Sequence, residues 1–68
     1  MTMDDDTLNM SIRKFLKKVG INSQRELERA LEHADAAGRL DGSPVAVRVT
    51  LDCELLDAPL VVEDEIKY

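Results

Sequence analysis

The residues that could carry chemistry in this chain are few and far apart. The sequence of 68 residues holds one histidine, His33, and one cysteine, Cys53. A general base needs a nucleophile and an orienting partner within reach, and no residue near His33 in the sequence supplies them. The neighbours of Cys53 are both acidic, which disfavours a reactive thiolate. The sequence therefore predicts a protein that is not an enzyme.

Metal and cofactor sites are also not indicated. One histidine and one cysteine cannot build a zinc site. The acidic clusters Asp4–Asp6 and Glu63–Glu65 lack the glycine spacing of a calcium loop, and the three glycines are too scattered to form a phosphate-binding loop. We expect both clusters to be solvated charge, with no metal ion and no cofactor.

The charges of the chain are unevenly distributed. Residues 8–31 hold six basic and two acidic residues, between an acidic start and an acidic remainder, and the net charge is −5. Four of the basic residues, Arg13, Lys14, Lys17 and Lys18, lie close together on the polar side of a helical pattern. This face is a candidate binding site for an acidic protein partner, and its other interpretation is an ordinary solvated helix surface.

Helical periodicity predicts two helices within residues 7–38, after a flexible acidic lead-in at residues 1–6. Apolar residues recur at helical spacing from Leu8 to Val19, with Asp6 or Thr7 as the N-cap and Gly20 as the stop. A Ser-Gln-Arg-Glu capping box then starts a second apolar pattern that Gly38 ends. The short connection predicts a helical hairpin.

The period changes to two beyond the loop that contains Gly42 and Pro44. Valines and a leucine alternate with other residues from Val45 to Leu51, and a second alternating run follows from Leu60, which predicts two strands within residues 45–68. Leu55 and Leu56, between the runs, are expected to be buried across the sheet. The fold class is therefore α+β, a helical hairpin packed on an antiparallel β-hairpin, as one domain over residues 1–68.

The small size of the chain favours association with a second copy. A domain this short buries only about 60% of its unfolded surface, and the sequence offers neither a disulfide nor a metal site to stabilise it. We therefore predict a homodimer, in which equivalent strand edges pair to complete a four-stranded sheet. Exchange of the strand pair between the two copies is the other arrangement considered.

An alternative function is nucleic-acid binding. Residues 19–31 resemble the turn and second helix of helix-turn-helix proteins, in which the lysines would contact phosphates. The residues facing the major groove would be Ser23, Gln24, Arg25 and Glu28. The glutamates of this segment and the acidic remainder oppose binding to a polyanion, so a non-enzymatic interaction module is the preferred hypothesis.

The N-terminal residues do not form a secretory signal, because acidic residues stand where such a signal carries basic ones. No apolar run is long enough to span a membrane, and a single thiol fits a reducing compartment. We expect a cytoplasmic protein.

Taken as a whole, the chain resembles a family of small bacterial proteins, known mainly from alphaproteobacteria, that share a domain of unknown function. The resemblance rests on the segment NMSIRKFLKKVG at residues 9–20, the SQRE that follows it, and a β-rich end that contains Val61, Val62 and Ile66. It covers nearly the whole chain. It implies a bacterial, cytoplasmic protein and brings no catalytic residue, cofactor or partner.

Overall fold

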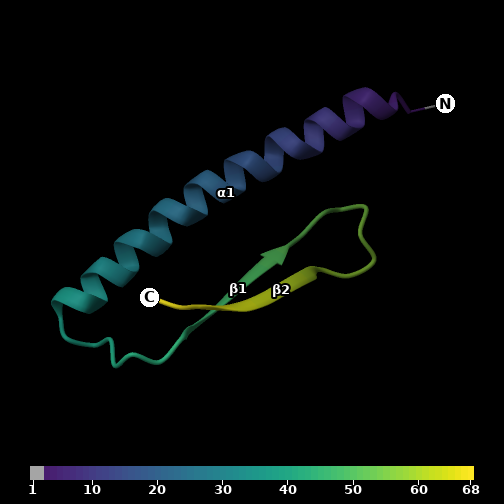
Figure 1. Cartoon of the computed structure of the whole chain (residues 1–68). Helices are drawn as coiled ribbons and strands as arrows, with labels where there is room; N and C mark the ends of the chain where they lie inside the picture. Colours follow the sequence, from purple (N-terminus) through teal and green to yellow (C-terminus); the bar gives the residue numbers. More distant parts are fainter. Residues whose placement is uncertain (1–2) are drawn as a thin grey trace.

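The computed structural model describes residues 3–68 as one long helix followed by a β-hairpin (Figure 1). Helix α1 spans Asp5–Ala36, and the antiparallel strands β1 and β2 span Val45–Leu51 and Leu60–Ile66. The predicted α+β class is confirmed. The predicted helical hairpin is wrong, because α1 continues through the residues that were expected to form its turn.

The N-terminus of α1 is capped by Asp4, not by Asp6 or Thr7 as the sequence suggested. The carboxylate of Asp4 accepts hydrogen bonds from the Thr7 hydroxyl at 2.9 Å and from the Asp6 backbone N–H at 3.1 Å. The Thr7 hydroxyl and these backbone donors hold the pKa of the Asp4 carboxyl below its ordinary value. Residues 5 and 6 of the expected flexible lead-in are therefore helical, and residues 1 and 2 lie outside the described part.

Gly20 does not end the helix. Its φ is not positive, so it is an ordinary helical residue rather than a left-handed stop. A glycine inside a helix costs about 1 kcal/mol relative to alanine, which is too little to break a helix that is favoured on both sides. Val19, Ser23 and Leu27 follow one another at intervals of four, so the two apolar patterns continue on one face of a single helix.

The C-terminus of α1 agrees with the prediction that Gly38 stops the helix. Gly38 adopts a φ of 68°, and its N–H donates to the carbonyl of Asp35 at 3.0 Å. The N–H of Arg39 donates to the carbonyl of Ala34 at 2.9 Å. These bonds satisfy carbonyl groups that the helix end would otherwise leave unpaired, and the chain then turns back toward β1.

The strands confirm the predicted alternation. Val45 pairs with Ile66 and Leu51 with Leu60, and paired residues in an antiparallel ladder point to the same face. One face of the hairpin, called here the apolar hairpin face, consists of Val45, Val47, Val49, Leu51, Leu60, Val62 and Ile66, with Asp64 as its one charged residue. The opposite face is polar and carries Arg48 opposite Glu63, with Glu65 beside them.

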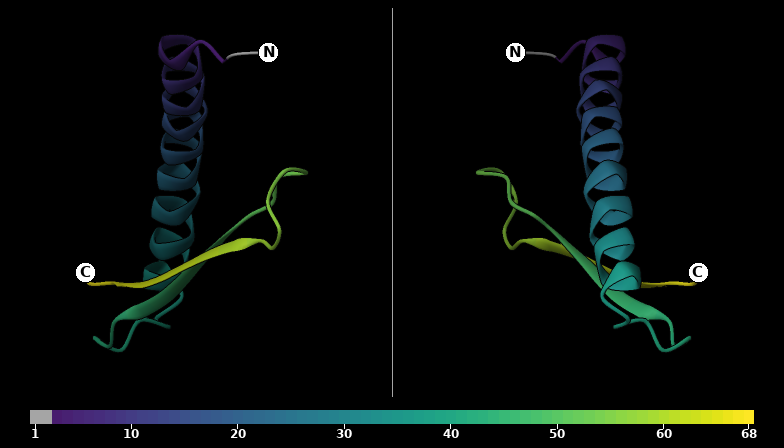
Figure 2. Two further views of the ribbon diagram at one scale, coloured as in Figure 1. Left: turned by 90° about the vertical axis from the view of Figure 1, so that its right-hand side faces the viewer. Right: turned by 90° about the vertical axis from the view of Figure 1, so that its left-hand side faces the viewer.

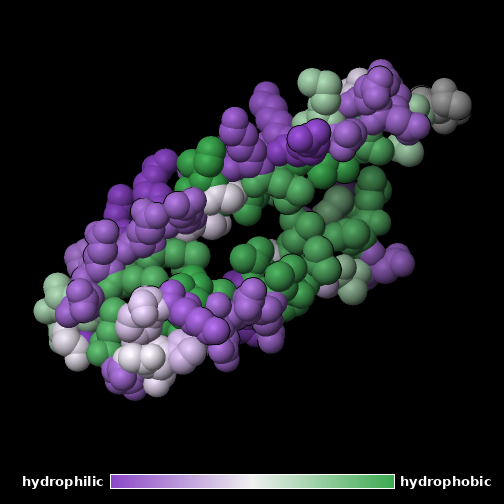
Figure 3. All heavy atoms as spheres, in the orientation of Figure 1, coloured by the Kyte–Doolittle hydropathy of each residue, from purple (hydrophilic) through white to green (hydrophobic). Residues whose placement is uncertain are grey.

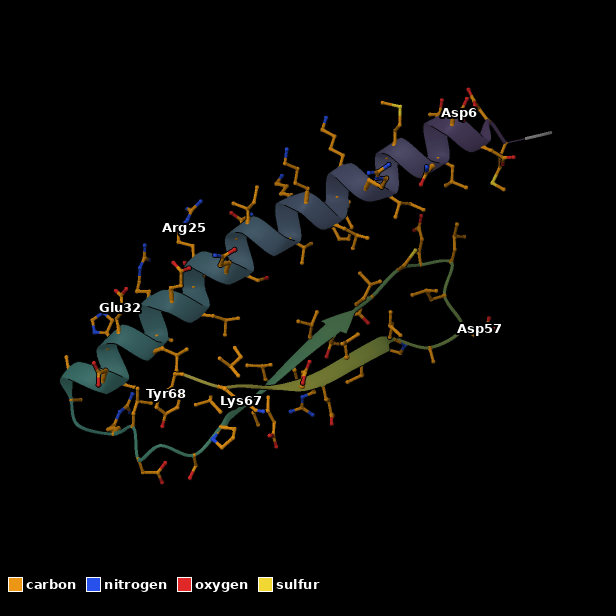
Figure 4. All side chains as sticks on the ribbon, in the orientation of Figure 1. Asp6, Arg25, Glu32, Asp57, Lys67 and Tyr68 are labelled. Carbon is orange, nitrogen blue, oxygen red and sulfur yellow. The ribbon has the colours of Figure 1, made fainter. Side chains whose placement is uncertain are left out.

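The loop between α1 and β1 is tied to the C-terminus of the chain. The N–H of Gly42, which has a φ of 91°, donates to the Tyr68 hydroxyl oxygen at 2.6 Å. Asp41 accepts from the Ser43 N–H at 2.9 Å, and this bond lowers the pKa of the Asp41 carboxyl. Tyr68 lies close to this loop and to the C-terminal end of α1 (Figure 4).

The loop between the strands does not cover the sheet. Leu55 is 87% exposed and Leu56 is 45% exposed, so the expectation that both are buried is wrong. The N–H of Leu56 donates to the carbonyl of Cys53, which closes a turn at the end of the hairpin. The turn lies beyond the ends of the two strands (Figure 1).

The described part of the chain has no closed core. None of its side chains is buried, and no Cα atom of α1 comes within 8 Å of a Cα atom of either strand. The radius of gyration is 16.5 Å, against about 11 Å for a compact domain of this length. Figure 2 shows the hairpin crossing α1 at an angle, and Figure 3 shows a gap between them that is bordered mainly by apolar residues.

Candidate interaction surfaces

The basic residues selected from the sequence lie on the exposed surface of α1. Lys14, Lys17 and Lys18 border an open surface hollow together with Ile21 and Asn22. Arg13 lies outside this hollow, but it precedes Lys17 by four residues and is therefore its neighbour on the helix surface. The four side chains, Arg13, Lys14, Lys17 and Lys18, are called here the basic face.

No acidic side chain neutralises the basic face within the described residues. The ion pair in this part of the chain joins Arg29 and Glu26 at 3.5 Å, one turn or more beyond the basic face. Residues 7–25 of α1 contain no aspartate or glutamate. Ile21, which is 52% exposed, adds an apolar contact point beside the lysines. The basic face therefore combines four charged groups with a small apolar area, all of it open to solvent.

A second surface, the apolar stripe of α1, was not recognised in the sequence. It consists of one residue per turn, and its members are Leu8, Ile12, Phe15, Val19, Ser23, Leu27, Ala30 and Ala34. Phe15 is 48% exposed, while Val19, Ser23 and Ala34 are half-buried. The signal that could have revealed a single stripe was the unbroken spacing of four from Val19 to Leu27, across the supposed turn.

The apolar stripe lies on the side of α1 that is turned toward the hairpin. Arg25 and Glu32, which belong to the polar side, project away from the hairpin (Figure 4). The apolar hairpin face also borders the gap, where Val45, Val47, Leu51 and Ile66 are half-buried. Leu60 and Val62 remain 52% and 55% exposed. Two apolar surfaces thus face the same space without filling it (Figure 3).

A family model matches residues 3–68, which is almost the complete chain. The chain belongs to DUF6494, a family of unknown function. No curated protein and no solved structure matches it. The resemblance of this DUF6494 protein to a family of unknown function is thereby confirmed.

The residues proposed to read nucleic acid in this DUF6494 protein do not form one surface. Ser23 belongs to the apolar stripe, whereas Arg25 projects from the opposite side of α1 (Figure 4). The Gln24 side-chain amide donates to the Glu28 carboxylate at 2.9 Å, so these two side chains bind each other. The turn of a helix-turn-helix motif is missing, because α1 is continuous from Asp5 to Ala36. The helix-turn-helix geometry expected for residues 19–31 is therefore wrong, and nucleic-acid binding itself stays a prediction.

The remaining candidate residues are separate in the fold. His33 lies in the last turn of α1, and Cys53 is exposed in the loop at the end of the hairpin. Asp4 caps the helix, while Glu63, Asp64 and Glu65 lie on alternating faces of β2. Within residues 3–68 there is no group of three histidine, cysteine, aspartate or glutamate residues that could hold a metal ion.

Although α1 has 32 residues, it has no segment apolar enough to cross a membrane. Its longest stretches without a charged residue, residues 7–12 and 19–24, are six residues long.

Proposed function

We propose that this protein is a non-enzymatic interaction module that acts as a homodimer and binds an acidic protein partner through the basic face. The observation that carries the proposal is the composition of that face: four exposed basic side chains, with no acidic residue in the surrounding helix from residue 7 to residue 25. Such a concentration of one charge accelerates encounter with an oppositely charged partner and selects against like-charged ones.

Surface area supports the homodimer. The chain exposes 6506 Å², whereas a compact monomer of this size exposes about 4,300 Å². Each chain therefore carries an excess of about 2,200 Å². Obligate homodimers bury about 2,000–5,000 Å² counted over both partners, so mutual burial of this excess by two copies is within the normal range.

The geometry of the homodimer has two candidate forms. Both outer strand edges of the hairpin lack a strand partner in the described part of the chain, so edge pairing into a four-stranded sheet remains a proposal. Contact through the apolar stripe of α1 is the other form. Exchange of hairpins through the 37–44 loop is a variant of either form. We also propose a bacterial, cytoplasmic location, where the exposed thiol of Cys53 would stay reduced.

A binding assay with matched charge variants tests the basic face. The triple variant Lys14→Gln, Lys17→Gln, Lys18→Gln removes three positive charges from the basic face, and Arg39→Gln, Arg48→Gln, Lys67→Gln removes three elsewhere. We expect a fluorescent poly-glutamate peptide to bind the unmodified protein at low salt, and to bind the first variant at least tenfold more weakly. The second variant is expected to lose no more than about threefold.

The same assay separates acidic peptide from nucleic acid and from the absence of a site. Equal losses of affinity for the two triple variants would mean that net charge alone explains the binding. That result would contradict a specific basic face. Tighter binding of a DNA duplex than of the peptide would contradict the acidic-protein proposal and revive the nucleic-acid alternative. Circular dichroism of each variant shows whether α1 is retained.

A further inference from the structure

The apolar stripe has the same spacing when read from either end. The intervals between its eight residues are 4, 3, 4, 4, 4, 3 and 4, so these one-per-turn positions are symmetric about residue 21. Leu16 and the half-buried Leu31 lie beside the stripe and stand outside this symmetry. A two-fold axis through that point, perpendicular to α1, places every stripe residue opposite another stripe residue of an antiparallel second helix. Ser23 is the one polar residue of the stripe and comes to lie opposite Val19, and the other pairs are formed by apolar residues.

The side-chain sizes along the stripe also fit an antiparallel pair. The symmetric spacing places Leu8 opposite Ala34 and Ile12 opposite Ala30, so that large residues face small ones. The same symmetry places Phe15 opposite Leu27 and Val19 opposite Ser23. Close packing requires large and small side chains to alternate across an interface. A parallel pair would instead place Phe15 against Phe15 and Ala30 against Ala30, with crowding at one end and a void at the other.

Charge favours the same direction. A parallel pair would bring the two basic faces, residues 13–18 of each copy, to the same height. An antiparallel pair places residues 13–18 at the height of residues 24–29, where two arginines and two glutamates balance. Like charges at one height repel and oppose assembly, whereas a balanced segment does not.

We propose that the apolar stripe of α1 packs antiparallel against the apolar stripe of a second copy of this chain. The apolar hairpin faces then cover the helix pair and close the gap that each chain leaves open by itself (Figure 3). This inference rests on the proposed homodimer and names its contact surface and its direction. The occupant of the gap is a second copy because the excess surface of one chain matches what a homodimer buries.

Cross-linking of single-cysteine chains tests the direction. In a Cys53→Ser background, one chain carries Leu8→Cys and another carries Ala34→Cys, and the two are refolded separately and as an equal mixture. Every covalent link with a short bismaleimide is then between two chains. We expect the mixture to form the mixed 8–34 product, and each chain by itself to remain at least tenfold less linked. Met10→Cys and Glu32→Cys form the matched control, since they are also symmetric about residue 21 but lie on the polar side of α1.

Light scattering on the same samples separates the two levels of the proposal. A monomer at all concentrations would overturn both the homodimer and the antiparallel stripe contact. A dimer in which Leu8→Cys links mainly to itself would show a parallel pair and overturn the direction. A dimer in which the control pair links as well as the 8–34 pair, or in which neither links, would overturn the stripe contact and leave strand-edge pairing in its place.

Discussion

Asp64 is the one charged residue on the otherwise apolar hairpin face. It occupies the apolar hairpin face opposite Val47, and its carboxylate accepts a hydrogen bond from the N–H of Glu65 at 2.7 Å. A carboxylate on a surface that closes against another apolar surface must be desolvated or remain at the margin. Asp64 is therefore expected to weaken the proposed homodimer.

Replacement of Asp64 gives a prediction at this scale. Asp64→Val is expected to tighten the homodimer about tenfold or more, because it removes a desolvation cost and adds apolar area in both copies. The dissociation constant, measured by sedimentation over a dilution series, checks the result. Glu63→Val is the matched control, because Glu63 is the adjacent residue on the polar face. Equal tightening by both variants would show that general hydrophobicity, rather than this face, controls assembly.

At the scale of the helix, Gly20 is the residue that tests whether α1 is continuous. It has helical backbone geometry, and a Cβ atom added there would meet no heavy atom within 4 Å. Gly20→Ala is therefore expected to stabilise the protein by about 0.5–1 kcal/mol, because alanine loses less backbone entropy in a helix. Urea unfolding followed by circular dichroism measures the change.

Gly38 supplies the comparison for this prediction. Its φ of 68° is unfavourable for alanine, so Gly38→Ala is expected to destabilise the protein even though the space around it is open. If Gly20→Ala also destabilised the protein, Gly20 would be a left-handed turn residue and α1 would divide into two helices. Opposite signs for the two glycines therefore confirm the continuous helix.

Local sequence signals predicted some of the helices and strands better than others. The strands and the stop at Gly38 were predicted correctly, because alternation and a left-handed glycine are local signals. The supposed turn at Gly20–Ser23 was wrong, because a glycine and a capping-box pattern are each compatible with a helix interior. Whether such a pattern starts a new helix depends on what the apolar residues pack against. The spacing of four from Val19 to Leu27 predicted the continuous helix better than the glycine and the capping box did.

The candidate surfaces show the same limit. The basic face could be selected from the sequence, because four basic residues within six positions must share one exposed helix surface. The apolar stripe was divided between two expected helices, and its full length followed from the continuity of α1. Leu55 and Leu56 were assigned to a core because leucines usually belong to one, but residues 3–68 of a single chain contain no buried side chain.

At the scale of the whole molecule, the proposed homodimer would supply the apolar contacts that one chain lacks. One chain has no buried side chain among its described residues, so its apolar contacts cannot offset the entropy of ordering a long helix and a hairpin. Isolated two-stranded hairpins are marginal in water, and helices obtain most of their stability from packing. Folding and association should therefore occur as one transition.

This coupling predicts a concentration-dependent melting temperature. When folded dimers unfold to separate chains, dilution favours the unfolded state, and Tm is expected to fall by about 3–6 °C for each tenfold dilution. Thermal circular dichroism over a hundredfold range of concentration measures the shift. The cross-linked 8–34 dimer should lose most of this dependence, because its chains cannot separate. A Tm that stayed constant for the unlinked protein, together with a monomeric mass, would mean that the gap closes within one chain and that the apolar stripe packs on its own hairpin.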